Sequence, residues 1–235
     1  MTTACTNTRF TSIGEQMARI VIFGVQDFAQ LAHFYISRDG KDTVVAFTVH
    51  EKYIESPTFM GLPVVPFEHV EESYPPAQYQ MFAPMSSARM NTIREDVFNQ
   101  VKARGYTCIS YISPLATYYD TPIGENCFIF ENNVIQPFTS IGNNVIMWSG
   151  NHLGHHSAIA DHCFVASHVV ISGHVAIQEN CFIGVNATLN NGITVAKNTF
   201  IGSGALVTST TQECGVYPGV AAELSRVPSH KLRGI

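Results

Sequence analysis

Between residues 123 and 207, a bulky aliphatic residue or methionine recurs at every sixth position without an insertion. The fifteen positions are Ile123, Ile129, Ile135, Ile141, Met147, Leu153, Ile159, Val165, Ile171, Ile177, Ile183, Leu189, Val195, Ile201 and Val207. A period of six fits neither an α-helix nor the alternation of an ordinary strand. It therefore indicates a larger winding unit that repeats along the chain.

Two further columns of the repeat describe that unit. Four residues after each aliphatic the side chains are mostly small, as at Cys127, Thr139, Ser157, Cys163, Cys181, Ala187, Thr199 and Ala205. Three residues after it, thirteen of fifteen positions hold Asn, Gly or His, residue types that enter the positive-φ region most readily. Each hexad is thus predicted to be a short strand and a corner. Three corners close a triangle, so one coil takes about eighteen residues and the segment forms about five coils.

The hexads Ile123-Gly124-Glu125-Asn126-Cys127-Phe128 and Ile201-Gly202-Ser203-Gly204-Ala205-Leu206 fit the pattern [LIV]-[GAED]-x-x-[STAV]-x. In this respect the chain resembles the hexapeptide-repeat acyltransferases. The resemblance implies a left-handed parallel β-helix and assembly as a homotrimer. The period itself reports neither the hand nor the assembly.

Residues 18–106 have a different pattern. Strands are predicted at 19–24, 43–49, 61–65 and 79–83, and helices at 27–38 and 94–104. This alternation predicts a parallel α/β, Rossmann-like domain. Gly24 closes the first strand, where such sheets bind a nucleotide phosphate, but Gly24-Val25-Gln26 keeps only the first glycine of a phosphate-binding turn. A plain strand-to-helix turn is an equally good interpretation.

The domain organisation predicted from these patterns has four parts. Residues 1–17 are an N-terminal extension, 18–106 a Rossmann-like substrate domain, 107–213 the β-helix acyltransferase domain and 214–235 a C-terminal tail. No run of eighteen apolar residues occurs, and residues 1–17 lack the apolar stretch of a signal peptide, so we expect a soluble, cytoplasmic protein without membrane insertion.

Charge and cysteine content limit the partners further. A net charge of −5 without a basic cluster disfavours nucleic acid and anionic membranes as partners. Six cysteines fit a reducing compartment as free thiols. Cys127, Cys163 and Cys181 stand in the small inward column, so they are predicted to fill the core.

The order of a Rossmann-like domain before a β-helix is similar to a narrower group, the bacterial sugar acetyltransferases typified by the sialic acid O-acetyltransferase NeuD and the bacillosamine-pathway N-acetyltransferase PglD. The resemblance runs from about residue 19 to 222 and includes Met90-Asn91-x-x-Arg94 and the ending Gly219-Val220-Ala221-Ala222. It implies a nucleotide-linked sugar held in the first domain by Gly24, Val25 and Gln26, and acetyl-CoA bound along the β-helix between neighbouring subunits, without a metal. Such enzymes serve the biosynthesis of surface polysaccharides such as lipopolysaccharide. The chain departs from the family at Ala221, where the family has Pro, and in its mostly lost glycine-rich turn.

Six of the ten histidines fall between residues 152 and 174. Acyl transfer to an amine or hydroxyl needs a general base, and neutral imidazole suits that role at cytoplasmic pH. His156, His162, His168 and His174 occupy the corner column, with consecutive ones on different corners roughly 15 Å apart. They are therefore not expected to converge on a metal, and only His156 and His174 stack on one corner. His162 and His168 are interpreted as corner-forming residues or subunit contacts.

His155 precedes the corner, where no conformational requirement selects histidine. The resemblance places the catalytic base there, with His156 and His152 as alternatives. In the family an acidic residue usually follows the base and orients it, whereas His156 follows here. The resemblance also places acetyl-CoA against Gly173 directly, and against Val185, Ser203 and Gly204 by register. Transfer would be direct, without a cysteine or serine nucleophile.

Three other interpretations are open at this stage. One is a zinc enzyme of the γ-carbonic anhydrase type, although its His-x4-His pair is absent from the cluster. Another is a non-catalytic hexapeptide-repeat binding protein, which would not need so many histidines in two coils. The last keeps acetyl transfer but changes the acceptor, as in O-acetylation of sialic acid, serine or another small hydroxyl compound.

Overall fold

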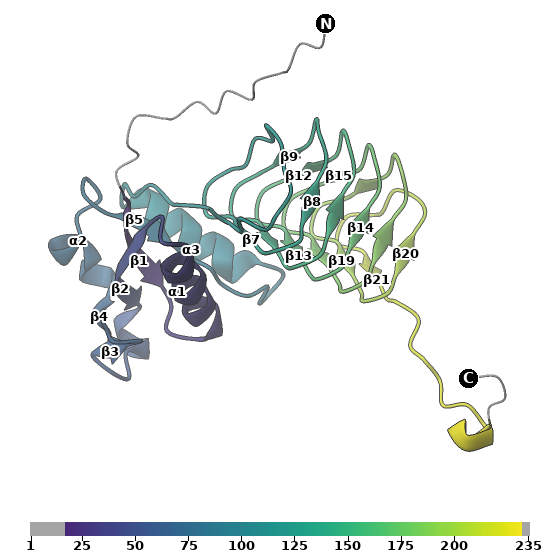
Figure 1. Ribbon diagram of the computed structural model, residues 1–235, viewed down its shortest axis with the longest axis horizontal. Coiled ribbons are helices and arrows are strands. Elements are labelled where there is room, and N and C mark those ends of the chain that lie inside the picture. Colours follow the sequence, from purple (N-terminus) through teal and green to yellow (C-terminus); the bar gives the residue numbers. More distant parts are fainter. Residues whose placement is uncertain (1–16, 232–235) are drawn as a thin grey trace, which may run out of the picture.

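The computed structural model describes residues 17–231, which form a sheet domain followed by a β-helix (Figure 1). All but the last residue of the predicted extension 1–17 lies outside the described residues. Among the described residues, no helix is both long and apolar enough to cross a membrane.

The N-terminal domain is a five-stranded sheet with the order β3-β4-β2-β1-β5. Its strands are β1 (Arg19–Phe23), β2 (Thr43–Val49), β3 (Thr58–Phe59), β4 (Leu62–Pro66) and β5 (Gln80–Phe82). Its helices are α1 (Asp27–Asp39), α2 (Val70–Ser73) and α3 (Thr92–Ala103), with short 3-10 turns η1 (Glu51–Tyr53) and η2 (Phe67–His69). All neighbouring strands pair in parallel except β3 with β4. The predicted Rossmann-like character is confirmed.

The burial of the central strand β1 fits the parallel pairing of this sheet. Ile20, Val21 and Ile22 of β1 are all fully buried, so both faces of the central strand are covered, as parallel sheets require. Helix α1 ends at Gly40, which adopts a left-handed conformation (φ 65°) and donates its N–H to the Ile36 carbonyl.

The β-helix has three flat faces built from two-residue strands. The first face consists of β6 (Tyr111–Ile112), β7 (Phe128–Ile129), β10 (Ile146–Met147), β13 (Phe164–Val165), β16 (Phe182–Ile183), β19 (Phe200–Ile201) and β21 (Val216–Tyr217). The second face consists of β8 (Val134–Ile135), β11 (His152–Leu153), β14 (Val170–Ile171), β17 (Thr188–Leu189) and β20 (Leu206–Val207). The third face consists of β9 (Ser140–Ile141), β12 (Ala158–Ile159), β15 (Ala176–Ile177) and β18 (Thr194–Val195). The predicted left-handed parallel β-helix is confirmed.

Residues eighteen apart pair across successive coils, for example Ile129 with Met147 and Met147 with Val165. The predicted coil length is therefore correct. All thirteen predicted corner residues have positive φ: Asn126, Asn132, Asn144, Gly150, His156, His162, His168, His174, Asn180, Asn186, Gly192, Asn198 and Gly204. Phe138 also has positive φ (64°), which its residue type does not predict.

The corners form three edges. The α3 corner joins the third face to the first and carries Asn126, Asn144, His162, Asn180 and Asn198. The open corner joins the first face to the second and carries Asn132, Gly150, His168, Asn186 and Gly204. The histidine corner joins the second face to the third and carries Phe138, His156, His174 and Gly192, with His155 next to His156.

Inside the coils, Cys127, Cys163 and Cys181 are free and fully buried in the aliphatic core, which confirms their prediction as core residues. Strand β21 pairs with β19, so the β-helix continues past residue 213, the predicted boundary.

Aromatic side chains join the two domains across the outer side of the first face. Phe28 of α1 meets Trp148 edge-on at 5.8 Å between ring centroids, and Tyr35 meets Phe130 at 5.4 Å. Phe128 is fully buried in the same cluster. The N-terminal domain therefore covers part of the first face.

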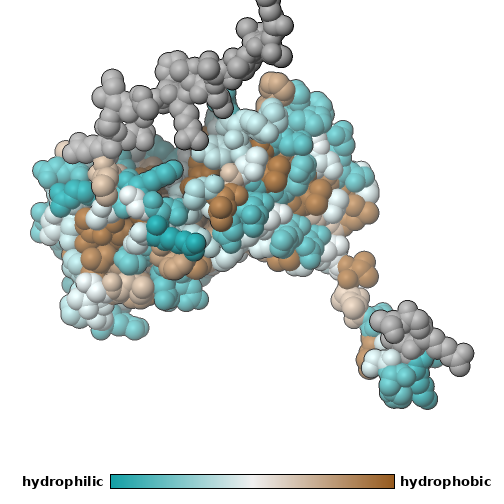
Figure 2. All heavy atoms as spheres, viewed as in Figure 1, coloured by the Kyte–Doolittle hydropathy of each residue, from teal (hydrophilic) through white to brown (hydrophobic). Residues whose placement is uncertain are grey.

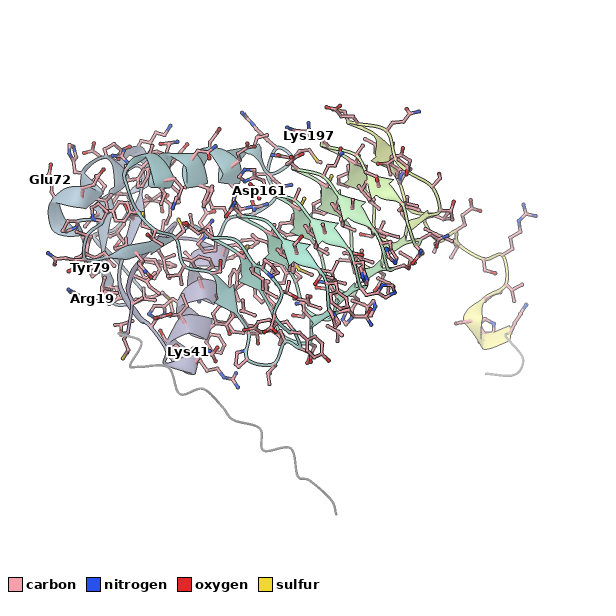
Figure 3. All side chains as sticks on the ribbon, turned by 90° about the horizontal axis from the view of Figure 1, so that it is seen from above. Arg19, Lys41, Glu72, Tyr79, Asp161 and Lys197 are labelled. Carbon is pink, nitrogen blue, oxygen red and sulfur yellow. The ribbon has the colours of Figure 1, made fainter. Side chains whose placement is uncertain are left out.

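Helix α3 is clamped to the α3 corner by a buried arginine. Arg94 donates to the carbonyls of Asn144 and His162, the latter at 3.0 Å, and to Asn91 Oδ1 at 2.9 Å. Asn91 in turn donates to the Cys181 carbonyl at 3.1 Å. Burial lowers the pKa of Arg94 to about 10, so the group is still a cation at neutral pH. Asp161 and Lys197, labelled in Figure 3, lie one residue before corner positions of this edge.

Candidate functional site

The histidine corner carries a column of stacked rings. The His156 and His174 rings lie 4.9 Å apart and are nearly parallel, at 15°, as the register predicts. Phe138 lies against the other side of His156 at 4.8 Å. Positive φ at all three positions points the side chains outward from equivalent places in successive coils.

His155 stands edge-on to this column. Its ring centroid lies 5.2 Å from that of His156 and 5.0 Å from that of His174, at 87° and 88°. Its backbone is held on both sides, because His155 N–H donates to Gln136 Oε1 at 2.9 Å and His174 N–H donates to the His155 carbonyl at 2.9 Å. All three imidazoles are exposed.

One hydrogen bond can orient the His155 ring. Its Nδ1 lies 3.1 Å from Nδ1 of His156, so one of these nitrogens donates to the other. If His155 carries its proton on Nδ1, it donates to His156 and presents an unprotonated Nε2. In that tautomer His156 acts as a neutral hydrogen-bond acceptor for the His155 ring.

Gly173 lies against the His155 ring. A Cβ on Gly173 would stand 2.8 Å from both Cε1 and Nε2 of His155, and 3.1 Å from Oδ1 of Asn191. Only glycine leaves room for the imidazole in this position. The contact with a cofactor predicted for Gly173 stays a prediction.

The other predicted cofactor contacts lie elsewhere. Val185, Ser203 and Gly204 gather at the open corner, where Gly204 N–H donates to the Val185 carbonyl at 2.8 Å. All three are exposed. The structure therefore brings these three together but separates them from Gly173. The two groups stand at the two edges of the second face.

Gly24, Val25 and Gln26 form the turn between β1 and α1 in the N-terminal domain. Gly24 has φ 115° and donates its N–H to the Thr48 carbonyl at 2.8 Å. The turn is at the carboxyl end of β1, the edge where parallel sheets bind ligands. It belongs to a different domain from the histidine corner.

A hydrogen-bonded histidine and glutamate near that same edge were not predicted from the sequence. His50 follows β2 and Glu68 follows β4; His50 Nδ1 lies 2.9 Å from Glu68 Oε1, and Glu51 N–H donates to Oε2 at 3.0 Å. Burial acts to raise the pKa of Glu68, but these hydrogen bonds outweigh it and lower the pKa to about 2. His50 directly follows one predicted strand and Glu68 comes three residues after another, and this placement is the signal that could have found them.

The other corner histidines are separate, as expected. His162 is buried at the α3 corner, where its Nδ1 lies 2.9 Å from Asn144 Nδ2, and burial lowers its pKa. His168 is exposed at the open corner, and His152 lies in β11 on the second face. Neither His162 nor His168 is near the histidine corner.

One feature of the cluster differs from the expectation. Each of His155, His156 and His174 offers a ring nitrogen within 4.8 Å of the others, a spacing that could hold a metal ion. The repeat correctly placed consecutive corner histidines on different corners of the coil. That reasoning covered the corner column only, and His155 stands outside it. These three histidines therefore come together without a His-x4-His pair.

No family model and no curated protein matches this chain. Several solved structures do. The acetyltransferase domain of PglB from Neisseria gonorrhoeae is 18% identical with a TM-score of 0.75, over 84% of this chain and 95% of that chain. PerB, a perosamine N-acetyltransferase from Caulobacter crescentus solved with CoA and GDP-perosamine, is 21% identical with a TM-score of 0.77, over 89% and 98%. WeeI from Acinetobacter baumannii is 18% identical with a TM-score of 0.59, over 87% and 97%.

The chain has the fold of these three proteins. Two of them are described as acetyltransferases, the PglB domain and PerB, and PerB acts on perosamine. The likeness extends over both domains, since nearly the whole length of each neighbour is covered. At these identities the comparison establishes the fold.

Proposed function

We propose that this protein is an acetyl-CoA-dependent acetyltransferase that acylates the amino group of a nucleotide-linked sugar, with His155 as general base. The observation that carries the proposal is the His155 imidazole, exposed on a rigid corner and anchored through Nδ1 by His156. A base held in this way on a β-helix edge fits direct acyl transfer.

The proposed step needs no covalent enzyme intermediate. The acceptor nitrogen attacks the thioester carbonyl carbon, and a C–N bond forms. His155 Nε2 accepts the proton that the nitrogen loses. The C–S bond then breaks, and CoA leaves as a thiol after taking a proton from the imidazolium. Backbone N–H groups would stabilise the oxyanion, a contribution typically worth about 3 kcal/mol per donor.

The acceptor class is supported by the neighbours and by the first domain. PerB was solved with CoA and GDP-perosamine, a nucleotide-linked amino sugar. In this chain Gly24, Val25 and Gln26 form the turn at the carboxyl edge of a parallel sheet, where we place the nucleotide. Such a product would enter surface polysaccharide biosynthesis, including lipopolysaccharide, in the cytoplasm. O-acetylation of sialic acid or another small hydroxyl compound is the second candidate, because His155 could serve either nucleophile.

The topology supports a homotrimer as the active form. The N-terminal domain packs on the first face and the α3 corner, whereas His155 lies on the corner opposite the first face. A sugar bound by the same chain would have to reach around a β-helix whose sides are roughly 15 Å long. A neighbouring subunit could bring its substrate domain to this corner directly.

The second face offers the contact surface for such an assembly. Its outward residues stand in register along successive coils, and among them Val134, Val170 and Leu206 are 42%, 43% and 65% exposed. Figure 2 shows apolar residues at the surface of the β-helix. We place acetyl-CoA between subunits along this face, against Gly173, Val185, Ser203 and Gly204. Burial of these apolar side chains would stabilise the trimer.

The test is CoA release from acetyl-CoA with a panel of nucleotide-linked amino sugars, with sialic acid and simple hydroxyl compounds as a second arm. We expect His155→Ala to lower kcat by about 10²-fold or more, while the Kd for acetyl-CoA changes little. Normal activity of this variant beside an inactive His156→Ala would move the base by one residue. A wild-type protein that binds acetyl-CoA but acylates no acceptor would favour the non-catalytic binding protein.

A further inference from the structure

We propose that His155, His156 and His174 form a binding site for a divalent transition-metal ion such as Zn²⁺ or Ni²⁺, and that the bound ion switches acetyl transfer off. The three side chains each offer a ring nitrogen within 4.8 Å of the other two. They come from two adjacent coils of a rigid β-helix, so the backbone positions of the site are preset.

The geometry is close to that of a tetrahedral metal centre. Zinc–nitrogen bonds of about 2.0–2.1 Å place two ligand nitrogens about 3.3 Å apart. Nδ1 of His155 and Nδ1 of His156 are already 3.1 Å apart. The third imidazole, on His174, has to approach by at most about 1.5 Å (4.8 − 3.3), and its exposed ring can turn to do so.

Backbone hydrogen bonding fixes the register of the two coils next to the three histidines. His174 N–H donates to the His155 carbonyl at 2.9 Å, and the His156 and His174 rings already stack at 4.9 Å. The main chain therefore needs no rearrangement to bring the third ligand in. Little backbone entropy is therefore lost when the ion binds, and the cost is confined to ordering the exposed rings.

The donor set selects the class of ion. Three neutral imidazoles suit Zn²⁺, Ni²⁺ and Cu²⁺, whereas Mg²⁺ and Ca²⁺ require oxygen ligands. Three protein ligands also leave a fourth position open for water. The three ligands stand at positions i, i+1 and i+19. This spacing brings them together only because one coil takes eighteen residues, so a short sequence motif does not reveal it.

The inhibitory effect rests on the proposed function. An ion bound to Nδ1 of His155 leaves the ring proton on Nε2, the nitrogen that has to accept the proton of the acceptor. The same ring therefore cannot bind the ion and act as the base. Removing the ion with a chelator would restore the base.

Calorimetric titration of the metal-stripped full-length protein with ZnCl₂ and NiCl₂ tests the site without any substrate. The variant is His174→Asn, and the matched control is His168→Asn on the open corner. Both residues have nearly the same φ, 58° and 59°, and asparagine occupies six other corners, so both variants should fold. We expect one ion per chain in the wild type and in His168→Asn, and at least tenfold weaker binding in His174→Asn. Equal affinity of His174→Asn and wild type, or equal binding of MgCl₂, would overturn the site.

Transfer assays with and without Zn²⁺ then separate the two proposals. Loss of CoA release on adding Zn²⁺, reversed by EDTA, supports the switch. Binding that depends on His174 but leaves transfer unchanged overturns the inhibitory role. If the metal-free protein acylates no acceptor while His174-dependent binding is present, the proposed function fails and the site stands. If the metal-free protein is active and binds no ion, the metal site fails and the proposed function stands.

Discussion

Replacement of Gly173 by alanine should separate catalysis from stability at the histidine corner. The added Cβ would lie 2.8 Å from Cε1 and Nε2 of His155, where ordinary contacts begin at 3.4 Å. The imidazole has to move by about 0.6 Å (3.4 − 2.8) to restore an ordinary contact. Since a misplacement of about 1 Å can cost about 10²-fold in rate, we expect kcat to fall by roughly 10- to 100-fold.

The free energy of unfolding of Gly173→Ala should not fall together with kcat. The ring that must move is exposed, and Gly173 does not have positive φ, so alanine fits the backbone without strain. Alanine also restricts the unfolded chain, which typically stabilises a protein by about 0.4–1 kcal/mol at such a site. Urea unfolding should thus show unchanged or slightly higher stability.

A double-mutant cycle with His155→Ala tests whether displacement of the His155 ring causes the lower kcat of Gly173→Ala. Without the imidazole, the added Cβ meets chiefly Asn191 Oδ1 at 3.1 Å, so the double variant should be little slower than His155→Ala alone. A KM for acetyl-CoA that also rises would support the proposed contact of Gly173 with the cofactor, whereas a raised KM with normal kcat would show that alanine disturbs this contact alone and leaves the base in place. Unchanged kcat and KM in Gly173→Ala would refute the claim that the position of the His155 ring matters for transfer.

Three further predictions concern parts of the fold that support the site. Arg94→Met should lower the free energy of unfolding by about 3 kcal/mol in urea, because buried carbonyls lose a charged donor. Arg104→Met breaks a partly exposed ion pair with Glu71 and a cation–π contact with Phe67, so it should cost less, below about 2 kcal/mol, and equal losses would contradict the clamp. Phe138→Asn should stabilise the protein by about 1 kcal/mol, because Phe138 is 77% exposed with φ 64°; a lower Tm would show that its ring stack outweighs the strain. Glu68, with its pKa lowered to about 2, should contribute stability above about pH 4 that is lost as the pH falls toward 2. Glu68→Gln should flatten this part of the stability profile, and an unaltered profile would contradict the assignment.

The amino-acid sequence by itself determined the coil. A residue in every corner must tolerate positive φ, and a residue in every wall must fill a narrow core, so both requirements recur in the sequence with the period of the structure. Local residue patterns likewise predicted the strands and helices of the first domain. Cys127, Cys163 and Cys181 could be assigned to the core on register alone.

Only the tertiary structure decided which side chains meet. His155 and His174 are neighbours because one coil returns beside the next, and Gly173 leaves space for a ring from the coil before it. The partners of Arg94 are backbone carbonyls, which carry no sequence signal. Local steric preferences can be read along a chain, whereas contacts between coils and between domains depend on the winding of the backbone and on side-chain rotamers that the period leaves open.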